Sequence, residues 1–159
     1  MDFKGIIRVL TNTKKTIATM ESCTGGGVVN EITNCEGSSE VLKFSAVTYS
    51  NEYKVKMGVS KKIIDKYTVY SMETADDMSK QISNFANSDY GIGITGQLNR
   101  PDPANPSSQN NIVYISIYDK ENNKYYREKM TIKKEIRRKS KDCIIQKVIE
   151  MLNIILKIS

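Results

Sequence analysis

Hydrophobic and polar positions follow one another along the chain in patterns that predict a succession of helices and short strands. At the start of the chain, apolar side chains recur every three or four positions, which predicts an amphipathic helix over 2–13. Runs rich in apolar and β-branched residues at 16–20, 44–49 and 90–95 predict three strands. The segments between these strands are helical in pattern and cover 28–32, 51–57, 60–66 and 71–87.

The C-terminal part of the chain predicts a hairpin followed by one long helix. Two β-rich runs, 112–118 and 125–132, are separated by six polar residues typical of a hairpin loop. The last helix has an apolar stripe that we expect to pack on the sheet, formed by Ile136, Ile144, Ile145, Val148, Ile149, Leu152, Ile155 and Leu156. Together these elements predict a three-layer α/β/α fold with a mixed sheet and helices on both faces, in one domain over 1–159.

Length and composition agree with one globular domain and exclude several kinds of site. A chain of 159 residues with 39% hydrophobic residues can bury a sizeable core. No apolar run approaches the roughly 18 to 20 residues of a membrane helix, so we expect a cytoplasmic protein without a membrane partner. The chain has no histidine, which excludes Ser-His-Asp and Cys-His catalysis and histidine metal ligands. Its three cysteines form no C-x-x-C pair of the kind found in zinc or dithiol sites.

Positive charge is concentrated in one segment near the last predicted helix. The formal net charge is +6, and residues 133–141 contribute +5 of it through six Lys or Arg residues and one Glu. Nucleic-acid-binding proteins usually spread basic residues over a face, so we expect no nucleic-acid partner and interpret the segment as a solvated helix start with one or two phosphate contacts. A nucleic-acid-binding module is the alternative, which salt-dependent binding of generic DNA or RNA would favour.

Polar residues able to carry chemistry stand at the ends of the three predicted strands. Ser22 precedes a glycine turn whose backbone N–H groups suit an anion or a developing oxyanion, although a serine at such a turn is also a typical helix cap. Ligands of open α/β sheets bind where strand ends meet, so we expect Ser22, Tyr49 and Thr95 to lie together. Without histidine, a serine nucleophile needs a carboxylate or a lysine as its base. Lys54, one turn into a predicted helix, is placed to point back toward Ser22, the alternative being a solvated lysine.

Several motifs in this chain resemble those of one family. They are ESCTGG at 21–26, GSS at 37–39, VTYSNE at 47–52 with Lys54, GV at 58–59, VYS at 69–71 and TG at 95–96. In this order, over about residues 5–155, they are similar to the C-terminal domain family of CinA, also called the nicotinamide-nucleotide amidohydrolase or nicotinamide mononucleotide deamidase family. The resemblance implies hydrolysis of the carboxamide of nicotinamide mononucleotide to nicotinic acid mononucleotide and ammonia, in NAD salvage, without a metal or organic cofactor.

The resemblance also implies roles for particular residues. Ser22 matches the nucleophile and Lys54 the lysine that activates it, with Tyr49 and Thr95 completing the predicted catalytic set. The residues expected to bind substrate are Cys23 and Thr24, through their backbone N–H groups, Gly25 in the glycine turn, Asn51 beside Tyr49, Gly96 after Thr95, and Arg137 or Arg138 at the nucleotide phosphate. Cys23 is an alternative nucleophile, which the absence of histidine disfavours. We expect a small-molecule nucleotide as the partner and, as for many small soluble enzymes, a homo-oligomer.

The chain departs from the family pattern after Gly96. The family continues with a glycine-rich loop, whereas residues 97–111 of this chain hold three prolines and several Asn and Ser residues. Arg100 in this segment is a further candidate for binding a phosphate or carboxylate, or is solvated. The departure leaves an alternative function open, that of a non-catalytic or altered-substrate nucleotide-binding homologue.

Overall fold

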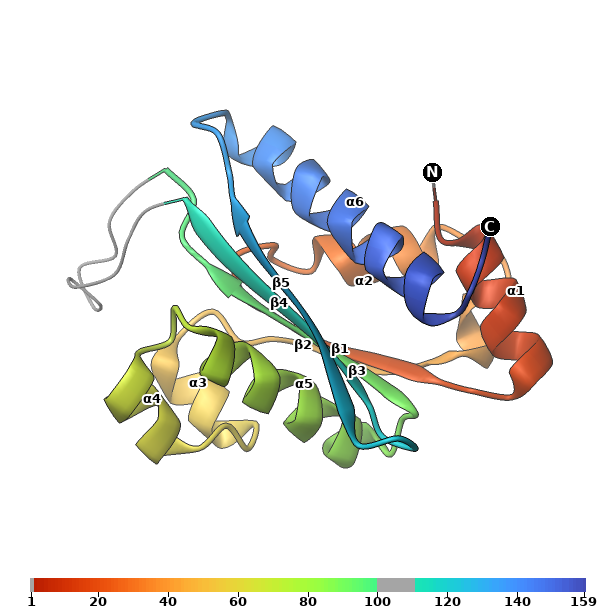
Figure 1. Cartoon of the computed structure of the whole chain (residues 1–159), viewed down its shortest axis with the longest axis horizontal. Helices are drawn as coiled ribbons and strands as arrows, with labels where there is room; N and C mark the ends of the chain where they lie inside the picture. The colour runs from red at the N-terminus through yellow and green to blue at the C-terminus, as the bar shows by residue number, and fades with distance from the viewer. Residues whose placement is uncertain (1, 100–110) are drawn as a thin grey trace.

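A mixed five-stranded β-sheet forms the middle layer of the protein (Figure 1). The computed structural model describes residues 2–99 and 111–159. Its strands are β1 (Ile17–Glu21), β2 (Leu42–Val47), β3 (Tyr90–Gly96), β4 (Ile112–Asp119) and β5 (Lys124–Thr131). They lie in the order β2-β1-β3-β4-β5, with β1 parallel to β2 and β3, and with β3, β4 and β5 antiparallel. The predicted α/β fold with a mixed sheet is confirmed.

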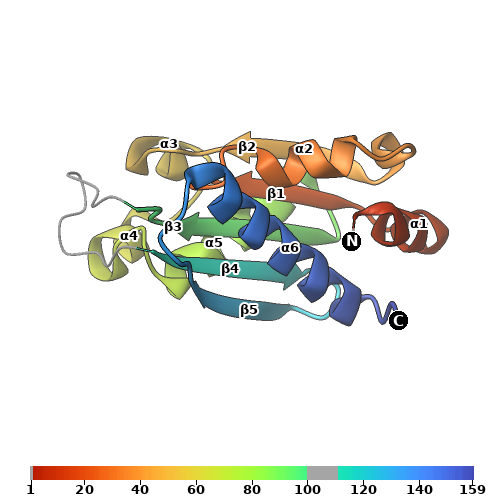
Figure 2. The same ribbon diagram turned by 90° about the horizontal axis from the view of Figure 1, so that it is seen from above.

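Helices cover both faces of this sheet, as Figures 1 and 2 show. One face carries α1 (Lys4–Thr13), α2 (Gly27–Thr33) and α6 (Arg137–Ile155), and the other carries α3 (Asn51–Lys56), α4 (Lys61–Tyr67) and α5 (Met72–Ala86). A short 3-10 helix at Ser38–Glu40, which the sequence pattern did not predict, lies between α2 and β2. Within the described residues, no helix has the length and apolar character needed to span a bilayer.

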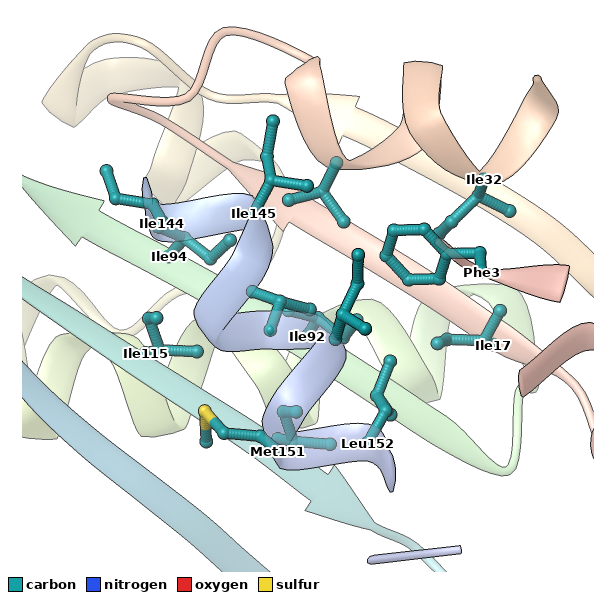
Figure 3. Close-up of a cluster of buried hydrophobic side chains, with 14 of the residues drawn as sticks. Phe3, Ile17, Ile32, Ile92, Ile94, Ile115, Ile144, Ile145, Met151 and Leu152 are labelled. Atoms are coloured by element: carbon teal, nitrogen blue, oxygen red, sulfur yellow. The ribbon is translucent and has the colours of Figure 1, made fainter. Parts of the chain in front are cut away.

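The larger hydrophobic core lies between the sheet and α6. Ile144 and Leu152 of α6 are fully buried, as are Ile92 and Ile115 of the strands beneath them (Figure 3). Val148 of α6 is also fully buried. The apolar stripe of the last helix therefore packs on the sheet as expected, with one exception at its start.

That exception is Ile136, whose predicted place in the stripe is wrong. It precedes the first residue of α6 in extended conformation and is 64% exposed. Helical spacing does not apply to a residue outside the helix, so the stripe begins at Ile144.

On the opposite face, α5 packs closely against β3 because two glycines of the strand lack side chains. A Cβ at Gly93 would lie 2.4 Å from the carbonyl oxygen of Ala75, and one at Gly91 would lie 2.0 Å from that of Ser79. The helix begins after Ser71, whose hydroxyl oxygen accepts the N–H of Thr74 at 3.1 Å. This cap and the two glycines hold α5 against the centre of the sheet.

The parallel pairing of β1 with both neighbours places three strand ends at one edge of the sheet. Glu21 at the end of β1 is paired with Val47 at the end of β2, and Met20 with Gly93 in β3. The segments that follow these strands therefore share one edge, where α3 and the start of α6 also lie (Figure 2).

Candidate active site

Ser22 and Lys54 form a buried pair at this edge. The Lys54 Nζ atom lies 3.1 Å from the Ser22 Oγ atom and donates a second hydrogen bond, of 2.7 Å, to the carbonyl oxygen of Thr48. Lys54 is 2% exposed and Ser22 7% exposed. The expected proximity of these two side chains is thus found, with the amine oriented by a fixed backbone carbonyl.

Local structure explains why Lys54 points back toward the strand ends. The helix α3 begins directly after Ser50, whose hydroxyl oxygen accepts the N–H of Tyr53 at 3.2 Å. Lys54 is then one turn into the helix, and side chains of a helix lean toward its N-terminus. The cap therefore fixes the start of α3 and, with it, the direction of the Lys54 side chain.

The Ser22 hydroxyl is presented by a sharp turn between β1 and α2. The N–H of Gly25 donates to the carbonyl oxygen of Ser22 at 2.9 Å. Gly25 and Gly26 have φ angles of +61° and +92°, in the left-handed region that favours glycine. The glycines allow the chain to reverse within a few residues, so that Ser22 stays at the strand end.

Glu21 is the residue of this site whose role the sequence did not indicate. It is completely buried, and its carboxylate accepts three hydrogen bonds from the segment beyond the turn. The donors are the Thr24 hydroxyl at 2.5 Å, the Val28 N–H at 3.0 Å and the Val29 N–H at 3.0 Å. An acidic residue at the end of a buried strand, directly before the Ser-Cys-Thr-Gly segment, was the signal that could have found it.

Tyr49 and Arg137 meet across the edge of the sheet. The Nη1 atom of Arg137, the first residue of α6, donates to the Tyr49 hydroxyl at 3.4 Å. Tyr49 lies two residues beyond the end of β2 and is 63% exposed. Asn51 is the first residue of α3 and is half-buried. The structure thus brings Tyr49, Asn51 and Arg137 to the same edge as Ser22.

Thr95 and Gly96 lie at the end of β3, with contacts directed into the protein. The Thr95 hydroxyl is fully buried and donates to the carbonyl oxygen of Val69 at 2.7 Å. A Cβ at Gly96 would lie 2.7 Å from the carbonyl oxygen of Ile112, so this glycine permits close strand packing. The predicted roles of both residues in the site stay predictions, and Arg100 lies outside the described residues.

A pocket of about 530 Å³ opens beside the glycine turn that follows Ser22, between α2 and α6. Thr24 and Gly25 line one side of it, and Arg138 and Lys141 line the other. The Lys141 Nζ atom lies 3.3 Å from the position that a Cβ of Gly25 would take. In the sequence Lys141 is one of six basic residues in the segment 133–141, and its place beside the turn depends on how α6 packs.

Cys23 is unsuited to act as the nucleophile. Burial raises the pKa of its thiol to about 12, although the positive charge of Lys54 acts in the opposite direction. A neutral thiol is a poor nucleophile, and Cys23 is only 5% exposed. Within residues 2–99 and 111–159, no group of three or more Cys, Asp and Glu residues is arranged to hold a metal ion.

The fold and the buried Ser–Lys pair define a three-layer α/β protein with a candidate nucleophilic site at its parallel strand ends. Residues 3–156 match the family model of the CinA C-terminal domain, and the chain belongs to this family. A CinA-like protein of Kosmotoga olearia is 40% identical over 114 residues, which are 71% of this chain and 27% of that protein. A CinA-like protein of Endomicrobium trichonymphae is 34% identical over 135 residues, or 84% of this chain and 31% of that protein. The chain thus spans less than a third of the length of these relatives.

Solved structures share the fold. The competence/damage inducible protein CihA from Agrobacterium tumefaciens superposes with a TM-score of 0.86 at 24% identity, covering 96% of this chain and 92% of that one. A CinA superfamily protein from Escherichia coli superposes with a TM-score of 0.84 at 21% identity, covering 94% of this chain and 85% of that one. At these identities the similarity establishes the architecture alone.

Proposed function

We propose that this protein is an amidohydrolase that converts nicotinamide mononucleotide to nicotinic acid mononucleotide and ammonia. The observation that carries the proposal is the buried pair of Ser22 Oγ and Lys54 Nζ, 3.1 Å apart. A nucleophile and a base within hydrogen-bonding distance are what acyl transfer from an amide requires. Family membership supports the choice of substrate class.

In the first half of the reaction, Ser22 becomes acylated. The neutral amine of Lys54 takes the hydroxyl proton while Ser22 Oγ attacks the carboxamide carbon. The resulting tetrahedral intermediate collapses, Lys54 donates that proton to the leaving nitrogen, and ammonia departs. The carbonyl oxygen of Thr48, 2.7 Å away, holds the amine in place throughout.

In the second half, a water molecule takes the place of the departed ammonia, next to Lys54 and the acylated Ser22. Lys54 takes a proton from water, which attacks the ester carbon of the acyl-enzyme. The ester bond breaks, and Ser22 Oγ regains a proton from Lys54. The product is nicotinic acid mononucleotide, and no metal or organic cofactor takes part. In both halves the backbone N–H groups of Cys23 and Thr24 stabilise the oxyanion, since they belong to the turn that holds Ser22.

The pocket between α2 and α6 accommodates the phosphate group of the substrate in this proposal. Arg138 and Lys141 supply positive charge on the side of α6, in a pocket that Glu31 and Asp142 also line, and the glycine turn lets a ligand approach the backbone. Arg137 instead holds Tyr49, to whose hydroxyl it donates, so that Tyr49 and Asn51 form a wall beside the pyridine ring. In this proposal the two neighbouring arginines therefore have different roles.

Ammonia release from nicotinamide mononucleotide tests the proposal. The wild-type protein is expected to release ammonia, Ser22→Ala to lose the activity, and Ser60→Ala to retain it because Ser60 lies outside the proposed site at the start of α4. Equal release by the wild type and Ser22→Ala would reject the mechanism. A folded wild-type protein that binds nicotinic acid mononucleotide but releases no ammonia would favour the nucleotide-binding alternative.

A further inference from the structure

We propose that Glu21 is a positioning residue for Ser22. Its buried carboxylate holds the turn that presents the serine hydroxyl to Lys54, without itself contacting the substrate. This inference rests on the nucleophilic role proposed for Ser22.

The contacts of Glu21 bridge the two sides of the turn. Oε1 accepts hydrogen bonds from the Thr24 hydroxyl at 2.5 Å and from the Val28 N–H at 3.0 Å. Oε2 accepts the Val29 N–H at 3.0 Å. All three donors follow Ser22 in the chain, so one side chain joins the end of β1 to the first turn of α2. The chain between these points, which includes Ser22, is closed into a ring.

The backbone of Glu21 reaches the other partner of the catalytic pair. Its carbonyl oxygen accepts the N–H of Thr48 at 2.8 Å. The carbonyl oxygen of Thr48 in turn accepts the hydrogen bond from Lys54 Nζ at 2.7 Å. Glu21 therefore contacts both the segment that carries Ser22 and the segment that orients Lys54. A shift of Glu21 changes the distance between Ser22 Oγ and Lys54 Nζ.

The chemistry of the three donors calls for a carboxylate at this position. Glu21 is 0% exposed, so its polar atoms must be satisfied by protein groups. Both oxygens accept hydrogen bonds, and bonds donated to a carboxylate are stronger than those between neutral groups. A glutamine has the same size, but its NH₂ group cannot accept a hydrogen bond. Glu21→Gln therefore leaves at least one donor of the turn unpaired with little change in volume.

Glu21→Gln is the first test, with two readouts on folded protein. One is the rate at which a fluorophosphonate labels Ser22, a step in which Oγ displaces fluoride from phosphorus and Lys54 takes the proton. The other is the pair kcat and KM for nicotinamide mononucleotide. Because a displacement of about 1 Å can cost about 100-fold in rate, we expect kcat and the labelling rate to fall together by about 10- to 100-fold. KM is expected to stay within about twofold, since Glu21 does not contact substrate in the proposal.

A control separates positioning from a purely structural role. Asp76 on α5 also accepts several hydrogen bonds, among them one from the Ser116 hydroxyl at 2.6 Å, and Arg127 pairs with it at 2.9 Å. Asp76→Asn is expected to lower the melting temperature while leaving kcat and Ser22 labelling at wild-type values. If Glu21→Gln behaves in the same way, with normal kcat and labelling, the inference is overturned.

Thr24 provides a second test that does not depend on whether Glu21→Gln folds. Thr24→Val removes the hydroxyl that donates to Glu21, whereas Thr24→Ser keeps it. The inference expects slower labelling and lower kcat for the valine variant and recovery in the serine variant. Equal rates for the two variants contradict it.

The labelling readout separates this inference from the proposed function. If wild-type protein labels at Ser22 but releases no ammonia from nicotinamide mononucleotide, the proposed substrate is wrong, and the labelling rates alone decide on Glu21. If wild-type protein is neither labelled at Ser22 nor active, Ser22 is not an activated nucleophile, and both proposals fail.

Discussion

Lys54 Nζ donates a 2.7 Å hydrogen bond to the carbonyl oxygen of Thr48, six residues earlier in the chain. This contact directs the amine from the first turns of α3 back to the end of β2. There it meets Ser22, which follows the neighbouring strand. The pair thus depends on the parallel register of β1 and β2, which places Glu21 beside Val47.

Replacing Lys54 by methionine keeps a long side chain but removes the proposed base. General-base catalysis contributes about 10² to 10⁴ in rate, so Lys54→Met is expected to lower kcat for ammonia release by about that factor. Lys61→Met is the matched control, because Lys61 is exposed and pairs with Asp65 at 2.9 Å. Similar kcat values for the two variants would show that Lys54 is not the base.

The phosphate site proposed between α2 and α6 predicts a change in KM without a change in kcat. Lys141→Met removes one positive charge beside Gly25. A hydrogen bond to a charged group contributes about 1.5–3 kcal/mol, so KM for nicotinamide mononucleotide is expected to rise about tenfold or more. Lys147→Met serves as control, since Lys147 lies further along α6 and pairs with Glu150 at 3.0 Å. An unchanged KM in steady-state assays of Lys141→Met would place the phosphate elsewhere.

Cysteine alkylation checks the environment of the turn that holds Ser22 and Cys23. Thiolates react with iodoacetamide, and the pKa of Cys23 is raised to about 12 by burial, so this thiol stays protonated at pH 8. Cys143 is exposed. Mass spectrometry of native protein after alkylation at pH 8 is expected to find Cys143 modified and Cys23 unmodified. Reactivity of Cys23 is expected to grow only as the pH rises toward its pKa. Modification of Cys23 at pH 8 would indicate that the turn leaves this thiol accessible.

The close contact between α5 and β3 predicts that one added methyl group lowers the free energy of unfolding. Gly93→Ala places a Cβ 2.4 Å from the carbonyl oxygen of Ala75, and such overpacking costs about 1–3 kcal/mol or more. Gly5→Ala is the control, because its Cβ would meet only Ile158, at 3.9 Å, and alanine favours a helix by about 0.5–1 kcal/mol. Urea unfolding is expected to find a lower free energy of unfolding for Gly93→Ala and an equal or higher one for Gly5→Ala. Equal stabilities would contradict the packing described for this face.

Much of the architecture could be read from local patterns. Among the described residues, periodicity located every helix and strand except the 3-10 helix at Ser38–Glu40, with ends that agree to within two residues. The motifs around Ser22 and Lys54 identified the family and a pair of side chains that the fold brings into contact. The elements and the motifs are visible in the sequence because each depends on residues close together in the chain, whereas the contact between Ser22 and Lys54 joins residues 32 positions apart.

Other features arise only when distant segments pack together. The burial of the Glu21 carboxylate requires β1 to lie inside the sheet, and Lys141 reaches Gly25 only because α6 lies over α2. The contact between Arg137 and Tyr49 joins residues 88 positions apart. The sequence alone therefore determined the elements, their order and the chemical character of the strand ends. Tertiary structure decided which polar groups are buried, which partners they hydrogen-bond and which cations face the pocket. The reason is that burial and charge pairing depend on long-range packing, which local periodicity does not encode.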